Sequence, residues 1–299
     1  MELEKEAKQL IEKSLKNHDK PFISCSFGKD SLVVMHLVHQ IDDSVPVFFA
    51  NTTVNHPSVL KVKNHYKEKV NLIETKPECN FWDIVNDYGW PIGARSTGTN
   101  KSVSECCKKL KKKPMADATE GFDLEFNGMN AYESWTRYCR IKADGDYKFV
   151  KSRGKNGRQV ALPIAWWRVE DVWRYIDKYD IVYPKIYDQP TENHSKLGYK
   201  DKVKGVKMDR GCIRVGCWTC PLTLKYTPGV MEQLREYYPK MWRALMDKGL
   251  AEEIVKIKTG IKTNGHEQGE LNLEDGTHQY LMDMIDDRLE RQPCYFDKI

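Results

Sequence analysis

The stretch Phe22-Ile-Ser-Cys-Ser-Phe-Gly28-Lys29-Asp30-Ser31-Leu-Val-Val-Met35 decides the fold, because it joins an apolar strand to an apolar helix through a short polar turn. Such a turn directs backbone N–H groups and the positive end of the helix dipole at one point, which favours an anion. Lys29 adds a positive charge, Gly28 allows close approach, and Ser31 can cap the helix. The spacing is not that of a Walker A loop. The turn predicts a phosphate site, with an ordinary capped strand-to-helix turn as the alternative.

The first half of the chain alternates apolar, β-rich runs with helical patterns, which is typical of a parallel sheet with crossover helices. The predicted strands are Pro21–Cys25, Val45–Ala50, Leu72–Thr75, Leu124–Met129 and Val160–Ile164. The predicted helices are Leu3–Lys16, one from Ser31, Pro57–Lys69, Phe81–Tyr88, Arg168–Lys178, Val230–Asp247 and His278–Leu289. The predicted loops are Gly89–Lys101, Tyr183–Met208 and Lys262–Gly276.

Composition places the 299-residue chain among soluble globular proteins, with 40% hydrophobic and 30% charged residues. The sequence shows no signal peptide and no apolar run of membrane-spanning length, so we expect a cytoplasmic setting without membrane contact. In that setting nine cysteines indicate metal or redox chemistry rather than disulfides. The net charge of +5 permits an anionic substrate or nucleic acid but requires neither.

Four cysteines form two doublets, Cys106-Cys107 and Cys217-Trp-Thr-Cys220. The first lies in a lysine-rich stretch, where a positive neighbourhood favours thiolates. The second is flanked by Gly216 and Pro221, which permit a tight turn. Together they offer four ligands for a metal or an iron–sulfur cluster, with zinc as the main alternative occupant. The single cysteines Cys25, Cys79, Cys139 and Cys294 are expected to be core or incidental residues.

Several motifs together resemble the phosphoadenylyl sulfate reductase family of the adenine nucleotide alpha-hydrolase-like superfamily of ATP pyrophosphatases. Residues Ser26–Ser31 resemble its pyrophosphate-binding loop, and Phe49–Pro57 resembles the segment after the second strand. Residues Gly128–Arg137 resemble its Gly-x-Arg-x-x-Glu-Ser motif, with Asn130 in place of the arginine. The segment Pro163–Ile176, followed by Tyr187-Asp188, resembles its Trp-x-x-Glu-Asp-Val-Trp motif. The resemblance covers about Ser24 to Pro221.

The resemblance implies a Rossmann-like, doubly wound, mostly parallel α/β sheet with a helical C-terminal extension. It divides the chain into an N-terminal helix (1–20), a nucleotide-binding domain with the cysteines (21–225) and the extension (226–299). The implied nucleotide-binding residues are Ser24, Ser26, Phe27, Gly28, Lys29, Asp30, Ser31, Asn51, Thr52, Thr53, Gly128, Glu133, Ser134 and Arg137. Lys29, Ser26 and Ser31 would stabilise a pyrophosphate leaving group, and Asp30 would hold Mg²⁺ or orient the phosphate.

The cysteine pattern resembles the adenylyl sulfate reductase branch, which implies a 4Fe-4S cluster bound by Cys106, Cys107, Cys217 and Cys220. Cys212 competes for one of these places. Two departures bear on the activity: the chain lacks the C-terminal Glu-Cys-Gly-x-His of assimilatory reductases, and Gly-Lys-Asp-Ser resembles relatives that cleave ATP between its α- and β-phosphates.

Three functional hypotheses follow. The first is an ATP-using enzyme that adenylates an acceptor for sulfur insertion, with a sulfur-donor protein as partner and a nucleic acid as acceptor, contacted by Lys108–Lys113. The alternative role of these lysines is to offset the negative charge of the cluster. The second is an adenylyl or phosphoadenylyl sulfate reductase that uses Cys294 as its nucleophile and a thiol-reductant protein. The third is a nucleotide-sensing or scaffold subunit with a structural cluster. A homo-oligomer is compatible with all three.

Overall fold

A six-stranded sheet forms the centre of the computed structural model, which describes residues 2–91, 105–133, 135–143, 149–151, 158–189, 215–220 and 229–250. The strand order is β3-β2-β1-β4-β6-β5, and only β5 runs antiparallel to its neighbour. The strands are β1 (Pro21–Ser24), β2 (Val47–Ala50), β3 (Leu72–Thr75), β4 (Leu124–Asn127), β5 (Phe149–Lys151) and β6 (Gln159–Ala161). The chain builds outward from β1 in both directions. The predicted Rossmann-like, doubly wound α/β fold is therefore confirmed.

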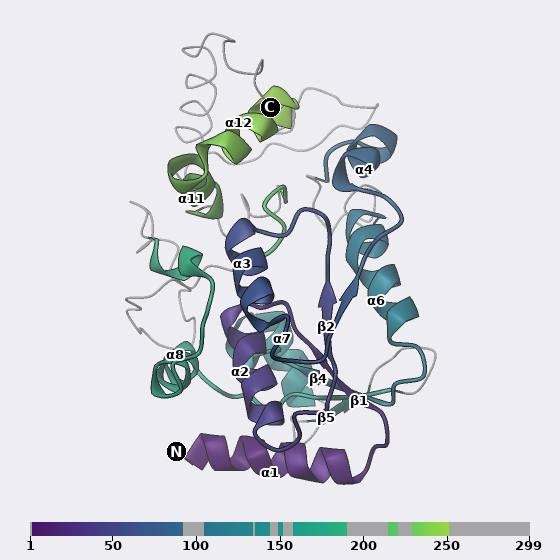
Figure 1. Cartoon of the computed structure of the whole chain (residues 1–299), viewed down its shortest axis with the longest axis vertical. Coiled ribbons are helices and arrows are strands. Elements are labelled where there is room, and N and C mark those ends of the chain that lie inside the picture. Colours follow the sequence, from purple (N-terminus) through teal and green to yellow (C-terminus); the bar gives the residue numbers. More distant parts are fainter. Residues whose placement is uncertain are drawn as a thin grey trace.

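Helices cover the two faces of this sheet, and Figure 1 shows α2 and α3 on one side of β2 with α6 on the other. The α-helices are α1 (Glu2–Lys16), α2 (Lys29–His39), α3 (Pro57–Tyr66), α4 (Phe81–Tyr88), α6 (Lys113–Ala118), α7 (Trp135–Ala143), α8 (Val169–Lys178), α11 (Gly229–Tyr237) and α12 (Pro239–Asp247). Short turns are the π-helical η2 (Lys108–Lys112) and the 3₁₀ segments η3 (Ala131–Glu133) and η4 (Lys185–Asp188). In the described residues, no helix is both long and apolar enough to cross a bilayer.

The main core lies between the sheet and helices α1, α2 and α8. Leu32, Val33, Leu37 and Val38 of α2 are fully buried, as expected of a helix this apolar that packs on a sheet. Burial of such side chains contributes about 1.5–3 kcal/mol each. This packing fixes the first turn of α2 at the carboxyl end of β1.

A second apolar cluster lies beyond the carboxyl ends of the strands, where Figure 1 shows α11 and α12 above β2. Phe81 of α4, Leu110 of η2, Leu234 of α11 and Trp242 of α12 are buried in it. Cys79, Cys106, Cys217 and Trp218 pack against it. The C-terminal helices therefore support the segments that carry the cysteines.

Some elements differ from the sequence-based prediction. The single helix predicted over Val230–Asp247 is two helices, because Tyr238 (φ −134°, ψ 56°) precedes Pro239 and proline disfavours the helical conformation of the residue before it. The edge strand β5 and helix α7 were not predicted. The predicted segments Lys262–Gly276 and His278–Leu289 lie outside the described residues.

Candidate nucleotide and cysteine site

The turn between β1 and α2 lies at the point where the sheet order reverses. From β1 the chain goes first to β2 and β3 on one side and later to β4 on the other. In open α/β sheets, ligands bind in the crevice that this reversal leaves outside the carboxyl ends of the strands. The topology therefore places the predicted phosphate turn where a ligand is expected.

Hydrogen bonds between two serines shape this turn. The Ser31 hydroxyl accepts from the Ser26 N–H at 3.2 Å and donates to the Gly28 carbonyl at 3.0 Å. The Ser26 hydroxyl accepts from the Gly28 N–H at 3.4 Å. Phe27, between Ser26 and Gly28, has a positive φ of 53°, a conformation that costs a non-glycine residue about 1 kcal/mol or more. Phe27 is also fully buried. The turn is thus held in one shape without a ligand.

The prediction that Ser31 caps α2 is wrong. Gly28 is the N-cap residue, and the helix has no side-chain cap. Ser31 is already inside the first helical turn, so its hydroxyl bonds back to Gly28 instead of covering a free N–H. The uncapped N-terminus leaves backbone donors and the positive end of the helix dipole available for an anion.

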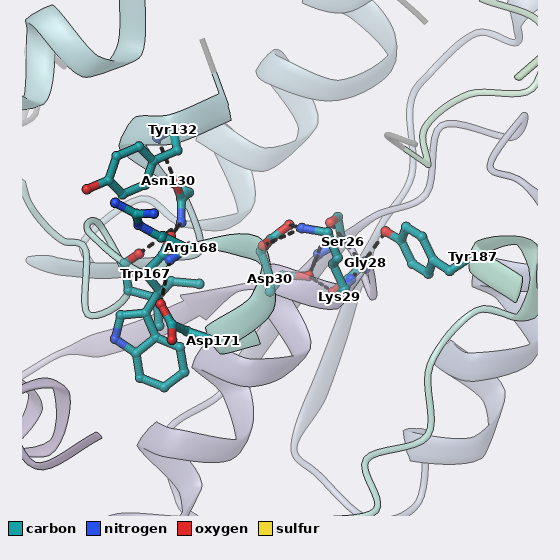
Figure 2. A network of polar contacts seen from close by, with 12 residues as sticks. Ser26, Gly28, Lys29, Asp30, Asn130, Tyr132, Trp167, Arg168, Asp171 and Tyr187 are labelled. Atoms are coloured by element: carbon teal, nitrogen blue, oxygen red, sulfur yellow. Dashed lines mark hydrogen bonds and ion pairs between the residues drawn. The ribbon is translucent and has the colours of Figure 1, made fainter. Parts of the chain in front are cut away.

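Lys29 and Asp30 form an ion pair at this N-terminus, with the ammonium nitrogen 2.7 Å from both carboxylate oxygens. The Lys29 residue is only 6% exposed, and its side chain lies within the turn. Figure 2 shows the pair beside Ser26 and Gly28. Two of the three predicted catalytic residues, Lys29 and Asp30, are therefore paired with each other, and a phosphate that binds Lys29 would compete with Asp30 for the ammonium.

Gly128, at the end of β4, has a steric reason to be glycine. A Cβ atom there would lie 2.9 Å from the Asp30 carbonyl carbon and from the Ser31 nitrogen. Its role is therefore to let β4 approach the first turn of α2.

The predicted segment after β2 forms a turn of its own. Asn51 donates from its amide to Glu74 and accepts from the Thr53 N–H at 2.8 Å. Thr52 bonds to Asn55 through both its N–H and its hydroxyl, at 2.8 and 3.2 Å. These residues lie at the carboxyl end of the strand beside β1. Their predicted contacts with a nucleotide stay a prediction.

Asn130, which replaces the arginine of the resembled motif, has a structural function. It is 3% exposed, donates to the carbonyls of Ile164 and Trp167, and accepts from the Tyr132 N–H at 2.7 Å. Figure 2 shows Asn130 joining the loop after β4 to the one before α8. Arg137 lies on α7, whereas Ser134 and the side chain of Glu133 are outside the described residues.

The loop after β2 also holds the second cysteine doublet. The Trp218 N–H donates to the Val54 carbonyl at 3.0 Å, and the His56 N–H donates to the Gly216 carbonyl at 3.2 Å. Between these bonds Asn55 pairs with Cys217 in an antiparallel bridge. The Thr52 hydroxyl lies 3.2 Å from the Cys217 sulfur. The sequence carries no signal for this pairing, which brings Cys217 to the predicted nucleotide segment.

The two doublets come together at this edge, although 110 positions separate Cys107 from Cys217 in number. The pKa of Cys106 is raised to about 12, first by burial and then by the neighbouring thiols Cys107, Cys217, Cys220 and Cys79. Burial also raises the pKa of Cys217, against the opposing effects of Thr52 and Lys111. Cys79, expected to be incidental, is thus a fifth thiol in this neighbourhood.

At Cys106, burial raises the pKa first and the neighbouring thiols raise it further, which opposes the thiolate expected from the lysine-rich stretch. A thiolate set here needs a bound cationic centre to compensate it, and an all-thiol donor set fits zinc or an iron–sulfur cluster. Within the described ranges, no three cysteine, histidine or acidic side chains converge closely enough to hold a metal. Cys212 and Cys294 lie outside those ranges.

Comparison with known proteins settles the family, since residues 20–223 match the phosphoadenosine phosphosulfate reductase domain. The chain belongs to this family. It is 29% identical to an uncharacterised protein of Methanocaldococcus jannaschii over 80% of the chain but 43% of that protein. It is 24% identical to the adenosine 5'-phosphosulfate reductase of Bacillus cereus over 55% of the chain and 66% of that protein. The chain therefore spans less than two thirds of the length of these relatives.

Two solved structures show weaker likeness. The phosphoadenylyl-sulfate reductase of Candida auris has a TM-score of 0.48 and 14% identity, over 61% of this chain and 83% of that one. The U34-tRNA thiolase of Methanococcus maripaludis with its 4Fe-4S cluster has a TM-score of 0.41 and 16% identity, over 81% and 79%.

Proposed function

We propose that this protein is an iron–sulfur, ATP-dependent enzyme of cytoplasmic sulfur metabolism that adenylates an acceptor for sulfur insertion. The observation that carries the proposal is the hydrogen-bonded pairing of the loop after β2 with the Cys217 segment, beside the phosphate turn of β1 and α2. It brings a predicted nucleotide site and a thiol-rich site to one edge of the sheet.

The phosphate turn would act on the leaving group. An acceptor oxygen attacks the α-phosphorus of ATP, the bond to the β-phosphate oxygen breaks, and pyrophosphate leaves with the electron pair. Lys29 and the uncapped N–H groups of α2 would stabilise the developing charge, and Asp30, released from its ion pair, would hold Mg²⁺. Fixed donors of this kind contribute about 3–4 kcal/mol each in other enzymes.

Cys106, Cys107, Cys217 and Cys220 would hold the cluster, with Cys212 as the alternative ligand. When bound, a cluster of this type would supply redox-active iron. The run Lys108–Lys113 would contact phosphates of a nucleic-acid acceptor. Four of its lysines are exposed, namely Lys108, Lys111, Lys112 and Lys113. Among these four, in the part of the chain that the structure describes, ion pairs are present only at Lys108 and Lys113. A sulfur-donor protein would be the second partner.

A second candidate is sulfonucleotide reduction, which the similarity to the Bacillus cereus reductase favours. In that reaction the Cys294 thiolate would attack the sulfur of adenylyl sulfate, the bond between that sulfur and the phosphate oxygen would break, and AMP would leave. A thiol protein would then attack the Cys294 sulfur of the resulting thiosulfonate, forming a mixed disulfide and releasing sulfite.

One experiment distinguishes ATP-dependent adenylation from sulfonucleotide reduction. Protein purified anaerobically is incubated with ATP, Mg²⁺ and either tRNA or DNA, and in parallel with adenylyl sulfate and a dithiol. We expect pyrophosphate from ATP only when an acceptor is present, with the adenylyl group held on the acceptor, and AMP once sulfide is added and displaces it. We expect Lys29→Ala to lose at least tenfold in rate, because a charge-assisted contact is worth about 1.5–3 kcal/mol, whereas Lys61→Ala, at an exposed position of α3, keeps the rate. Sulfite formation from adenylyl sulfate, abolished by Cys294→Ser, would instead favour the reductase.

A further inference from the structure

Tyr187 reaches the phosphate turn from a distant part of the chain. It lies in η4, is 4% exposed, and packs its ring against Trp173 with the centroids 5.4 Å apart. Its hydroxyl accepts a hydrogen bond from the Lys29 N–H at 3.3 Å, across 158 positions of sequence. Figure 2 shows the phenol directed at Gly28 and Lys29.

The hydroxyl bonds to a backbone donor at the end of the helix where an anion is expected. The Lys29 N–H is the first backbone donor of α2, and such donors are what a helix N-terminus offers a phosphate oxygen. A Cβ on Gly28 would lie 3.2 Å from the Tyr187 oxygen, so glycine is what lets the phenol come this close.

A hydroxyl that accepts from one N–H still has its own hydrogen to donate. Burial, and then the nearby charge of Asp30, raise the pKa of Tyr187, so the phenol keeps this hydrogen at neutral pH. A protonated donor is thus held at the mouth of the turn, beside the ion pair of Lys29 and Asp30.

We propose that Tyr187 is a phosphate-positioning residue, whose hydroxyl donates a hydrogen bond to a phosphate oxygen of the adenine nucleotide bound at the turn. The inference rests on the proposed nucleotide site and deepens it, because it assigns Tyr187 to the phosphates and not to the base or ribose. The phenol oxygen accepts from the Lys29 N–H, and its own hydrogen would at the same time be donated to the phosphate from a separate segment of the chain.

The test uses the full chain and two ligands: α,β-methylene-ATP, which cannot be cleaved between its α- and β-phosphates, and adenosine, which has no phosphate. Binding is measured by calorimetry for the wild type, Tyr187→Phe and Tyr183→Phe. Phenylalanine keeps the ring packed against Trp173. Tyr183 is a matched control, because its hydroxyl bonds to Asp188 at 2.9 Å. We expect Tyr187→Phe to bind the ATP analogue about tenfold more weakly, with adenosine affinity unchanged, and Tyr183→Phe to change neither.

Two results would overturn the role proposed for Tyr187 while leaving the nucleotide site itself in place. One is analogue affinity in Tyr187→Phe that equals or exceeds that of the wild type. The other is an equal loss of affinity for both ligands, which would indicate a purely structural role. Failure of the nucleotide site itself is recognised in the wild type, which would then bind the analogue no more tightly than adenosine.

Discussion

Replacing Gly128 by alanine tests how β4 shapes the phosphate turn. The added methyl group would lie 2.9 Å from the Asp30 carbonyl carbon, 2.9 Å from the Ser31 nitrogen and 3.0 Å from the Asp30 carbonyl oxygen. Comfortable contacts between carbon atoms are about 3.5–4.0 Å, so the shortfall is about 0.6 Å or more. All three neighbours are backbone atoms of α2, which no side-chain rotation can move. The first turn of the helix must therefore shift away from β4.

Overpacking of this kind costs about 1–3 kcal/mol of folding free energy. We expect Gly128→Ala to lower the free energy of unfolding in urea by this amount, and to weaken the binding of an ATP analogue because the helix N-terminus has moved. Gly216→Ala is the control: a Cβ there would have no atom within 4 Å, and Gly216 has no positive φ. Alanine at such a position is neutral or stabilises by about 0.4–1 kcal/mol. Wild-type stability and wild-type nucleotide affinity in Gly128→Ala would refute the steric argument.

Two further predictions concern the thiols and the N-terminal helix. Anaerobically purified Cys217→Ser should have lost most of the iron and labile sulfide of the wild type. Cys79→Ser, which removes the fifth thiol of the same neighbourhood, should keep them. Stoichiometric zinc without sulfide in the wild type would contradict the cluster assignment. At Glu4 of α1, burial alone would raise the pKa, but hydrogen bonds from Lys178, Tyr179 and Lys8 outweigh it and lower the pKa from 4.5 to about 2. The stability that these bonds contribute is therefore present above about pH 4.5 and lost as the pH falls toward 2. The free energy of unfolding in urea, measured between these pH values, should depend less on pH in Glu4→Gln than in the exposed control Glu12→Gln. An equal pH dependence of this free energy in the two variants would count against this account.

Local signals in the sequence were enough for the sheet and for the phosphate turn. Strands β1 to β4 fall inside their predicted ranges, because apolar runs bounded by turn residues and separated by helical periods leave few alternatives. The break at Pro239 was readable from the sequence as well, since the residue before a proline is pushed out of the helical region. The predicted capping role of Ser31 was wrong because the helix begins earlier than predicted, with Gly28, three positions before Ser31, as its N-cap residue.

Contacts between residues far apart in the chain could not be predicted from these local sequence signals. Nothing in the spacing indicated that Tyr187 bonds the Lys29 N–H, that Asn55 pairs with Cys217, or that Cys79 joins the doublets. The raised pKa of Cys106, which opposes the expected thiolate, has a related reason. Charge is visible in the sequence, whereas burial depends on packing against helices that follow much later in the chain.

The packing of that second apolar cluster joins the two halves of the candidate site. Cys217 lies between Thr52, whose hydroxyl is 3.2 Å from its sulfur, and the cluster that contains Leu234 and Trp242 of the C-terminal helices. The loop after β2 therefore cannot move independently of the thiols, because backbone hydrogen bonds at Val54 and His56 fix it to the Cys217 segment. Since this loop follows the strand directly beside β1, the Cys217 segment is attached next to the strand that leads into the phosphate turn. Backbone contacts thus connect the thiol-rich segment to the predicted nucleotide segment after β2.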